Sequence, residues 1–251
     1  MKSIEQFIKE LDVEVPPIKE FYELSKKFPI IKNLTEEEHA LNYERGILLY
    51  SLVAKYKFKN ILEIGTASGF STLCMAKALD DKKIDGKIIT IDPIKPEINH
   101  SKIKILTGKF NEFRSSIPKS DFIFIDGHHS YNSVKHDFFS FVDIAKEQYS
   151  ILFDDYVVGE KNHVKKAVDE LIIPYLNYEL IIVNTKEQLE ELGKQTHLDF
   201  FMCWVYDNKS LNSLYPNKTK FLNKYDRNEK LQKLRKKIPI LKNYKIKFWK
   251  K

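Results

Sequence analysis

The chain has 251 residues and a formal net charge of +7, and 43% of its residues are hydrophobic. This composition excludes a disordered chain and fits a globular domain large enough to bury a complete sheet. No apolar stretch approaches the roughly 18 residues that a membrane-spanning helix needs. Residues 1–15 carry acids and no continuous apolar core, so no secretory signal is expected. Cys74 and Cys203 stand far apart in apolar surroundings, which predicts free buried thiols in a cytoplasmic protein.

Short apolar runs alternate along the chain with segments of helical periodicity, after an expected helical cap or lid at residues 1–45. Strands are predicted at 60–65, 86–92, 102–108, 121–126, 149–155, 178–183 and 198–206, and helices at 70–81, 130–148, 162–176 and 185–193. Continuously apolar strands separated by helices are typical of a parallel sheet covered on both faces. The predicted fold is therefore α/β: a doubly wound, mostly parallel, seven-stranded Rossmann-like sheet with helices on both faces, within residues 46–210.

Acidic residues and glycines gather at the carboxyl ends of the predicted strands. These positions are Glu63, Gly65, Asp92, Gly108, Asp126, Asp154 and Asp155. In such sheets ligands bind beyond the carboxyl ends of the strands. Several carboxylates at one rim repel one another, and a cation or a hydroxyl-rich ligand would relieve that repulsion.

The turn after the first of these strands reads LEIGTASGFST, residues 62–72. Gly65 and Gly69 would let the backbone approach a ligand closely, and Asp92 ends the next strand, where an acid can accept hydrogen bonds from ribose hydroxyls. The spacing of the glycines differs from G-x-G-x-x-G, and no G-K-[ST] follows, so a P-loop is excluded. The alternative is a tight turn between strand and helix, with an aspartate satisfied locally.

A second stretch, FIDGHHSYNSVKHDF at residues 124–138, places Asp126 and His129 three positions apart where a strand turns into a helix. Metal binding, acid–base catalysis and simple capping of the helix by Asp126 or Ser130 are all compatible with this pattern. His136 falls in the middle of the predicted helix and is expected to be structural or solvated. His128 is a candidate substrate contact.

LEIGTASGFST followed by IITIDP resembles the cofactor motifs of class I S-adenosylmethionine-dependent methyltransferases. DFIFIDGHHSYNSVKHDF followed by ILFDDY resembles the metal-dependent small-molecule O-methyltransferases, in particular those that act on sugars. The resemblance covers roughly residues 40–207 and departs from the family between the second and third strands. Only the nine residues PIKPEINHS lie there, where the fold usually has a helix.

The resemblance implies a cofactor, a metal and a base. The residues implied to bind S-adenosylmethionine are Glu63, Gly65, Ala67, Gly69, Ser71, Thr72, Asp92, Gly108 and Phe110, with Glu63 supporting the amino group and Asp92 holding the ribose. Asp126, Asp154 and Asp155 match the metal ligands, and His129 matches the catalytic base. Carboxylates from adjacent strand ends suit a hard divalent cation such as Mg²⁺, which would acidify and fix an acceptor hydroxyl.

The net positive charge belongs to the end of the chain. From residue 218 onward there are 14 Lys and Arg against Asp226 and Glu229, which gives +12, so the remainder carries 28 basic and 33 acidic residues, or −5. A slightly acidic body makes a nucleic-acid partner unlikely for the fold itself. The basic extension at 211–251 is expected to be solvated, with peripheral attachment to the anionic inner face of a membrane as the next interpretation.

The sequence thus predicts an O-methyltransferase that uses S-adenosylmethionine, a divalent cation and a histidine base. The expected acceptor is a sugar or another polyhydroxylated small molecule, free, nucleotide-linked or in a surface glycan. An RNA methyltransferase using the basic extension and a non-catalytic cofactor-binding protein are the alternatives. The sequence leaves open whether the chain forms a homo-oligomer.

Overall fold

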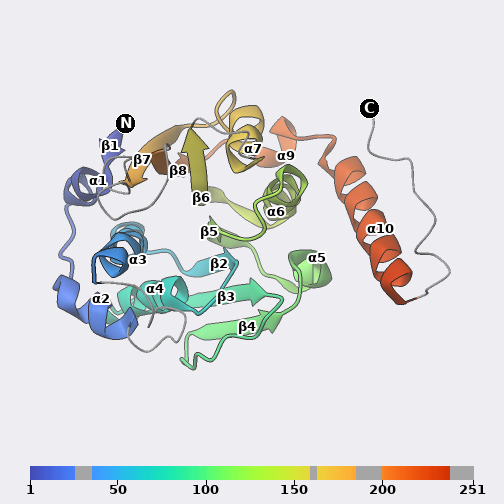
Figure 1. Ribbon diagram of the computed structural model, residues 1–251. Helices are drawn as coiled ribbons and strands as arrows, with labels where there is room; N and C mark the ends of the chain where they lie inside the picture. Colours follow the sequence, from blue (N-terminus) through green and yellow to red (C-terminus); the bar gives the residue numbers. More distant parts are fainter. Residues whose placement is uncertain (26–35, 159–162, 185–198, 238–251) are drawn as a thin grey trace.

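The computed structural model describes residues 1–25, 36–158, 163–184 and 199–237. A single sheet runs through the molecule, with helices on both of its sides (Figure 1). The strands are β1 (Lys2–Ser3), β2 (Asn60–Ile64), β3 (Lys87–Asp92), β4 (Ile103–Thr107), β5 (Ser120–Ile125), β6 (Ala145–Val158), β7 (Tyr178–Asn184) and β8 (Asp199–Asp207). The helices are α1 (Ile4–Glu10), α2 (Ile18–Ser25), α3 (Glu36–Tyr56), α4 (Phe70–Asp81), α5 (Phe110–Phe113), α6 (Tyr131–Ile144), α7 (His163–Leu171), α9 (Leu211–Leu214) and α10 (Lys218–Lys237), with a 3₁₀ turn at Arg114–Ser116.

The strands lie in the order β1-β7-β8-β6-β5-β2-β3-β4. All neighbouring pairs are parallel except those of β8, which is antiparallel to both β6 and β7. The chain starts the main sheet in the middle at β2, moves outward to β4, and then returns to the other side of β2 with β5. This reversal creates a crevice at the carboxyl ends of β2 and β5, where doubly wound sheets bind ligands. The predicted α/β fold is confirmed.

The sheet has eight strands among the described residues, so the expected count of seven is wrong by one. The additional strand is β1, which pairs in parallel with β7 through Lys2 opposite Ile181 and Ser3 opposite Ile182. Two residues are too few to show a period of two in the sequence. Ser3 also caps α1, because its side chain accepts from the Gln6 amide while the Gln6 side chain accepts from the Ser3 amide.

Both faces of the sheet are buried, which explains the uninterrupted apolar strands. Along β2, Ile61 belongs to the apolar cluster under α1, α3 and α4, whereas its neighbour Leu62 belongs to the cluster under α6 and α7. Phe122 and Ile123 divide in the same way on β5. Successive residues of a strand point to opposite faces, so the central strands are apolar at most positions. Cys74 and Cys203 are buried free thiols, as expected.

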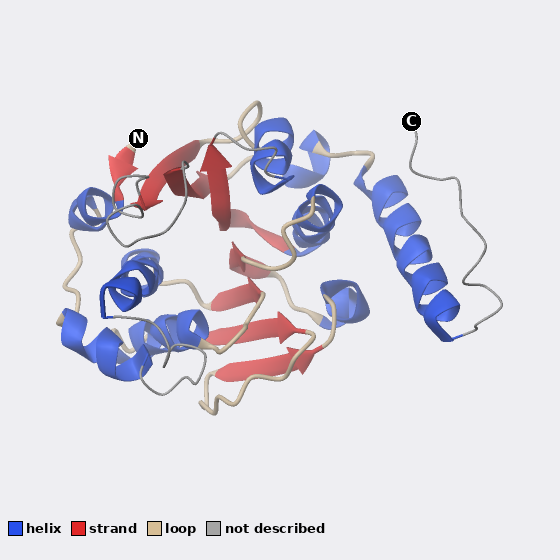
Figure 2. Cartoon of the chain, in the orientation of Figure 1, coloured by secondary structure: helices blue, strands red, loops and turns tan. Residues whose placement is uncertain are grey.

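The helix expected at 70–81 is present as α4 over the same residues. The helix expected at 130–148 is too long, because α6 ends at Ile144 and residues 145–148 begin β6, where Ala145 pairs with Ser120 of β5. The helix expected at 162–176 is shortened to α7, and the one expected at 185–193 falls outside the described residues. β3 and β4 are joined by a loop, in keeping with the short connection in the sequence (Figure 2).

No helix among the described residues has the length and apolar character needed to cross a membrane. The described part of the expected extension forms α9 and α10. Leu211, Tyr215 and Leu222 of this segment are buried in the same apolar cluster as α6 and α7. The beginning of α10 is therefore packed on the sheet domain, while the boundaries expected for separate segments stay predictions.

Candidate active site

A cavity of about 620 Å³ opens beyond the carboxyl ends of β2, β3, β4 and β5. Five of the residues expected from the sequence to bind a cofactor line this cavity: Gly65, Ala67, Asp92, Gly108 and Phe110. The expected metal ligand Asp126 lines it as well. Ile64, Ile91 and Pro93 add apolar surface. Helix α10 supplies a further wall, with Tyr225, Asn228, Glu229 and Gln232. The cavity thus lies at the crevice that the strand order creates.

The backbone after β2 is bent sharply where it meets the cavity. Gly65 has φ +93°, and a Cβ there would stand 2.0 Å from the Asp126 carbonyl oxygen, so only glycine is accommodated. Ala67 follows with φ +45°. Asp92 Oδ2 accepts from the amides of Thr66 and Ala67, both at 3.0 Å. One carboxylate therefore fixes the loop at the cavity wall. Its Oδ1 accepts from the Ile94 amide at 2.7 Å and keeps a lone pair that can accept a hydrogen bond from a ligand.

Glu63, Gly69, Ser71 and Thr72 lie behind this wall and do not line the cavity. Glu63 is fully buried and accepts hydrogen bonds from the hydroxyls of Ser71 (2.5 Å), Thr90 (2.5 Å) and Thr72. Burial raises the pKa of Glu63 to about 7, against the effect of the three hydroxyl donors. These residues tie β2, β3 and the first turn of α4 together. In the structure they support the loop, and their expected contacts with a cofactor stay a prediction.

An acidic cluster stands at the ends of β5 and β6. His129 Nε2 lies 3.2 Å from Asp155 Oδ2 and 3.6 Å from Asp126 Oδ1. One ligand atom of each of these three residues lies within 4.8 Å of the other two. A bulge in β6 between Phe153 and Tyr156 makes this possible, because Asp155 takes φ +55° there and leaves the regular alternation of side chains.

The charges of this cluster repel one another. Burial raises the pKa of Asp126 to about 7, and the neighbouring Asp154 and Asp155 carboxylates add to the shift. The pKa of Asp155 is raised as well, by burial and by Asp154. The neighbouring Asp126 and Asp155 carboxylates raise the pKa of the His129 imidazole. A divalent cation would offset this repulsion, so the two carboxylates, with the imidazole beside them, fit such an ion.

Asp154 was expected as a third ligand, but its side chain turns to Arg45 of α3. Arg45 Nε lies 3.3 Å from Asp154 Oδ2, and Asp154 Oδ1 accepts from the Asp155 amide at 2.8 Å. Arg45 Nη1 also donates to Asn184 at the end of β7 (3.4 Å). The structure gathers Asp126, His129 and Asp155 in place of the expected set. Sequence reasoning missed Arg45, because 109 residues separate it from Asp154.

Ser130 is the N-cap of α6, since its Oγ accepts from the Ser133 amide at 3.3 Å. Asp126 therefore does not cap the helix, and of the alternatives left open by the sequence the capping role falls to Ser130. His128 and His129 diverge. His128 lines the cavity, with Nδ1 accepting from the Ser130 amide at 3.1 Å, whereas His129 faces the carboxylates.

His136 is buried in the wall of the cavity and is not solvated. Its ring stacks on Tyr225 of α10 at 4.3 Å between centroids, and its Nδ1 lies 3.1 Å from Asp137 Oδ1. Sequence reasoning missed the α10 wall. The sequence does contain a signal for it: from residue 218 onward, where 14 residues are basic, Asp226 and Glu229 are the only two acids.

A larger and more open groove, of about 1030 Å³, lies at the opposite, amino-terminal edge of the sheet. Its carboxylate Asp121 accepts from the amides of Lys59 and Asn60 and pairs with Lys146 at 2.8 Å. Asp121 therefore joins strands and loops. The chemistry of the molecule concentrates in the smaller cavity and the acidic cluster beside it.

Residues 62–156 match a family model described as a methyltransferase domain. Rv0187 from MTB, solved with a cofactor bound, has 15% identity and a TM-score of 0.53 over 82% of this chain and 97% of its own. An O-methyltransferase from Bacillus cereus in complex with S-adenosylhomocysteine has 16% identity and a TM-score of 0.50, over 82% and 98%. The Podospora anserina methyltransferase PaMTH1, bound to S-adenosylhomocysteine, has 15% identity and a TM-score of 0.50, over 80% of this chain and 92% of its own. A search of curated proteins found no match.

Proposed function

We propose that the chain, whose residues 62–156 match a methyltransferase domain, transfers a methyl group from S-adenosylmethionine to a hydroxyl of a small polyhydroxylated acceptor, with the help of a divalent cation. One observation carries the proposal. Asp126 belongs both to the wall of the cavity and to the acidic cluster. A methyl donor in the cavity and an acceptor oxygen at the cluster would therefore meet at this residue, as an in-line displacement requires.

Different residues of the chain would bind the cofactor, hold the cation and accept the proton. The loop around Gly65 and Ala67, held by Asp92, would receive the cofactor, with the ribose hydroxyls at Asp92. Asp126 and Asp155 would hold Mg²⁺ or a similar ion through their carboxylates, and His129 would stay free of it. Such an ion, when bound, lowers the pKa of a coordinated hydroxyl and fixes its position. His129, half-exposed beside the carboxylates, is placed to collect the proton that the acceptor loses.

The acceptor class follows from the same donor set. A hard cation held by the two carboxylates keeps positions for further oxygen ligands, and a pair of neighbouring hydroxyls fills two of them. Sugars present such pairs on every ring. We therefore propose a sugar, free or attached to a nucleotide or glycan, as the acceptor.

The test is methyl transfer from labelled S-adenosylmethionine to a panel of nucleotide-linked sugars, glycan fragments and catechols, with and without a chelator. Transfer to at least one diol is expected, and chelation should abolish it. Asp126→Asn should lose about 10²–10³ of turnover, because an acceptor-positioning charge is removed. Asp92→Ala should weaken binding of S-adenosylhomocysteine instead. Turnover that survives exhaustive chelation would remove the metal from the proposal, and tight cofactor binding without any transfer would favour a binding protein.

A further inference from the structure

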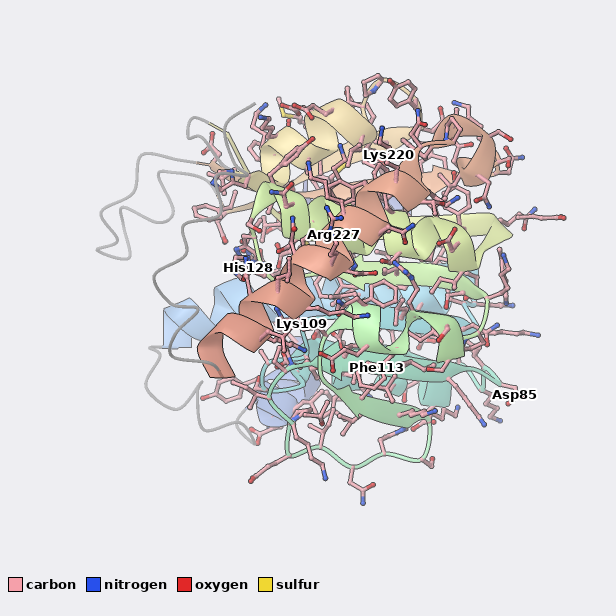
Figure 3. The ribbon with its side chains drawn as sticks, turned by 90° about the vertical axis from the view of Figure 1, so that its right-hand side faces the viewer. Asp85, Lys109, Phe113, His128, Lys220 and Arg227 are labelled. Carbon is pink, nitrogen blue, oxygen red and sulfur yellow. The ribbon has the colours of Figure 1, made fainter. Side chains whose placement is uncertain are left out.

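Helix α10 presents one face to the cavity. Tyr225, Asn228, Glu229 and Gln232 line it at positions three, four and seven residues apart, which is the spacing of a single helical face. The helix stands beyond the carboxyl ends of β2, β3 and β4 in Figure 1. In Figure 3 it crosses the front of the molecule from Lys220 towards Lys109 and His128, which also line the cavity.

The two acids of this otherwise basic segment fix the helix to the domain. Asp226 accepts from Asn111 Nδ2 at 3.2 Å and from Arg114 Nη2 at 3.3 Å. Glu229 pairs with Lys109, and Lys233 pairs with Glu112 at 2.6 Å. All four partners lie in the short segment that follows β4. These contacts set the rotation of α10, and so decide which of its faces meets the cavity.

Polar atoms at this junction lack hydrogen-bond partners. Among the described residues, five buried side-chain atoms have none, and three of them belong to Asn111, Arg114 and His136. Asn111 and His136 line the cavity. Because the Asn111 amide nitrogen donates to Asp226, its unpartnered oxygen is an acceptor. A buried acceptor without a donor is costly, so a small turn of the Asn111 side chain towards the cavity, where a ligand group could donate to it, would be favoured.

The position of this junction indicates which part of a ligand it would meet. Asp92 marks the end of β3 as the place for a ribose, and Lys109, Phe110 and Asn111 follow the next strand outward, β4. Phe110 and Ile91 offer apolar surface to a flat ring. An exocyclic amine on that ring would satisfy the Asn111 oxygen after this small turn of the side chain. This chemistry is that of an adenine base.

We propose that α10 is a wall of the cofactor site, and that its cavity-facing residues Asn228 and Gln232 enclose the purine end of S-adenosylmethionine. The inference rests on the proposed function, since it assumes that cofactor. The beginning of α10 is anchored by the buried Leu222 and by Phe221, whose ring lies 5.5 Å from Phe139. Beyond Tyr225 the helix is held by partly exposed ion pairs, which are individually weak. A bound purine would therefore strengthen its outer half.

The experiment compares two double variants of the full chain on the same helix. Asn228→Ala/Gln232→Ala changes the cavity face, and Arg227→Ala/Lys230→Ala changes exposed positions outside the cavity lining. Calorimetry measures the Kd for S-adenosylhomocysteine and for 5′-methylthioadenosine, which lacks the amino-acid part. The cavity variant should bind both about tenfold more weakly, the size expected for two lost hydrogen bonds. The control variant should bind like the wild type.

Hydrogen exchange supplies an independent measurement. S-adenosylhomocysteine should slow exchange of the amides of residues 225–234 in the wild type and less so in the cavity variant. Equal affinities of the cavity variant and the wild type, or a loss confined to S-adenosylhomocysteine, would overturn the role of α10 at the purine. Failure of the wild type to bind S-adenosylhomocysteine at all would instead overturn the proposed function.

Discussion

Two adjacent histidines at the end of β5 illustrate how single side chains divide between two sites. His129 Nε2 lies within 3.6 Å of both Asp126 and Asp155, while His128 lines the cavity and is tied to the start of α6. The carboxylates raise the pKa of His129 and so favour its protonated form. A divalent ion among the carboxylates would offset their charge and favour the neutral imidazole, which is the form that can act as a base.

His129→Ala should therefore lower the turnover number by about two to four orders of magnitude, the usual contribution of a general base. The Kd for S-adenosylhomocysteine should barely change, and His128→Ala should have a milder effect on turnover. The measurement is the turnover number of both variants across a titration of Mg²⁺. Recovery of His129→Ala at high Mg²⁺ would show that the residue acts as a ligand and not as a base. A crippled His128→Ala beside a normal His129→Ala would place the base on the other histidine.

At the scale of elements, Glu63 joins β2 to α4 and β3 through three hydroxyl donors. Its pKa is raised from 4.5 to about 7 by burial, so the folded protein favours the protonated carboxyl. The stabilising contribution of that proton is fully present below pH 4.5 and is lost as the pH rises through 7. At about 1.4 kcal/mol per pKa unit, the change is on the order of 3 kcal/mol.

Glu63→Gln removes this titration. The free energy of unfolding in urea, measured at pH 5 and pH 8, should therefore fall less between the two values in the variant than in the wild type. Other groups titrate alike in both proteins, so the difference between the two falls isolates Glu63. Identical falls would mean that the buried carboxyl is already ionised at pH 5 in the folded protein.

The helices and strands were largely predictable, because each main strand is a short apolar run that can be recognised in the sequence. Asp126, His129 and Asp155 could be placed near one another from the sequence, since the carboxyl ends of parallel neighbouring strands share one edge. The turn of Asp154 away from them could not, because it depends on the bulge in β6 and on Arg45 of a distant helix. The helix predicted at 130–148 was too long for a similar reason. Residues 145–148 have helical preferences, and pairing of β6 with β5 overrides them.

At the scale of the whole molecule, the acidic and basic residues of α10 face opposite ways. Asp226 and Glu229 of α10 contact the domain, whereas Lys220, Lys224, Arg227 and Lys230 of the same helix are exposed. Leu231 and Leu234 are exposed beside them. Residues 238–251, which fall outside the described residues, add five lysines, a phenylalanine and a tryptophan in sequence. Basic residues combined with apolar ones favour attachment to an anionic membrane surface.

We therefore expect the full chain to bind vesicles that contain phosphatidylserine, and removal of residues 238–251 to weaken that binding at least tenfold. Each lysine near such a surface contributes about 1 kcal/mol, and salt screens the attraction. Because Asn228, Gln232 and Lys233 remain in the truncated chain, its Kd for S-adenosylhomocysteine should be unchanged. Sedimentation with phosphatidylserine and phosphatidylcholine vesicles at two salt concentrations measures the effect. A control that replaces only the five lysines with glutamine separates charge from aromatic insertion. Equal vesicle binding by the full and truncated chains would remove the membrane from the account.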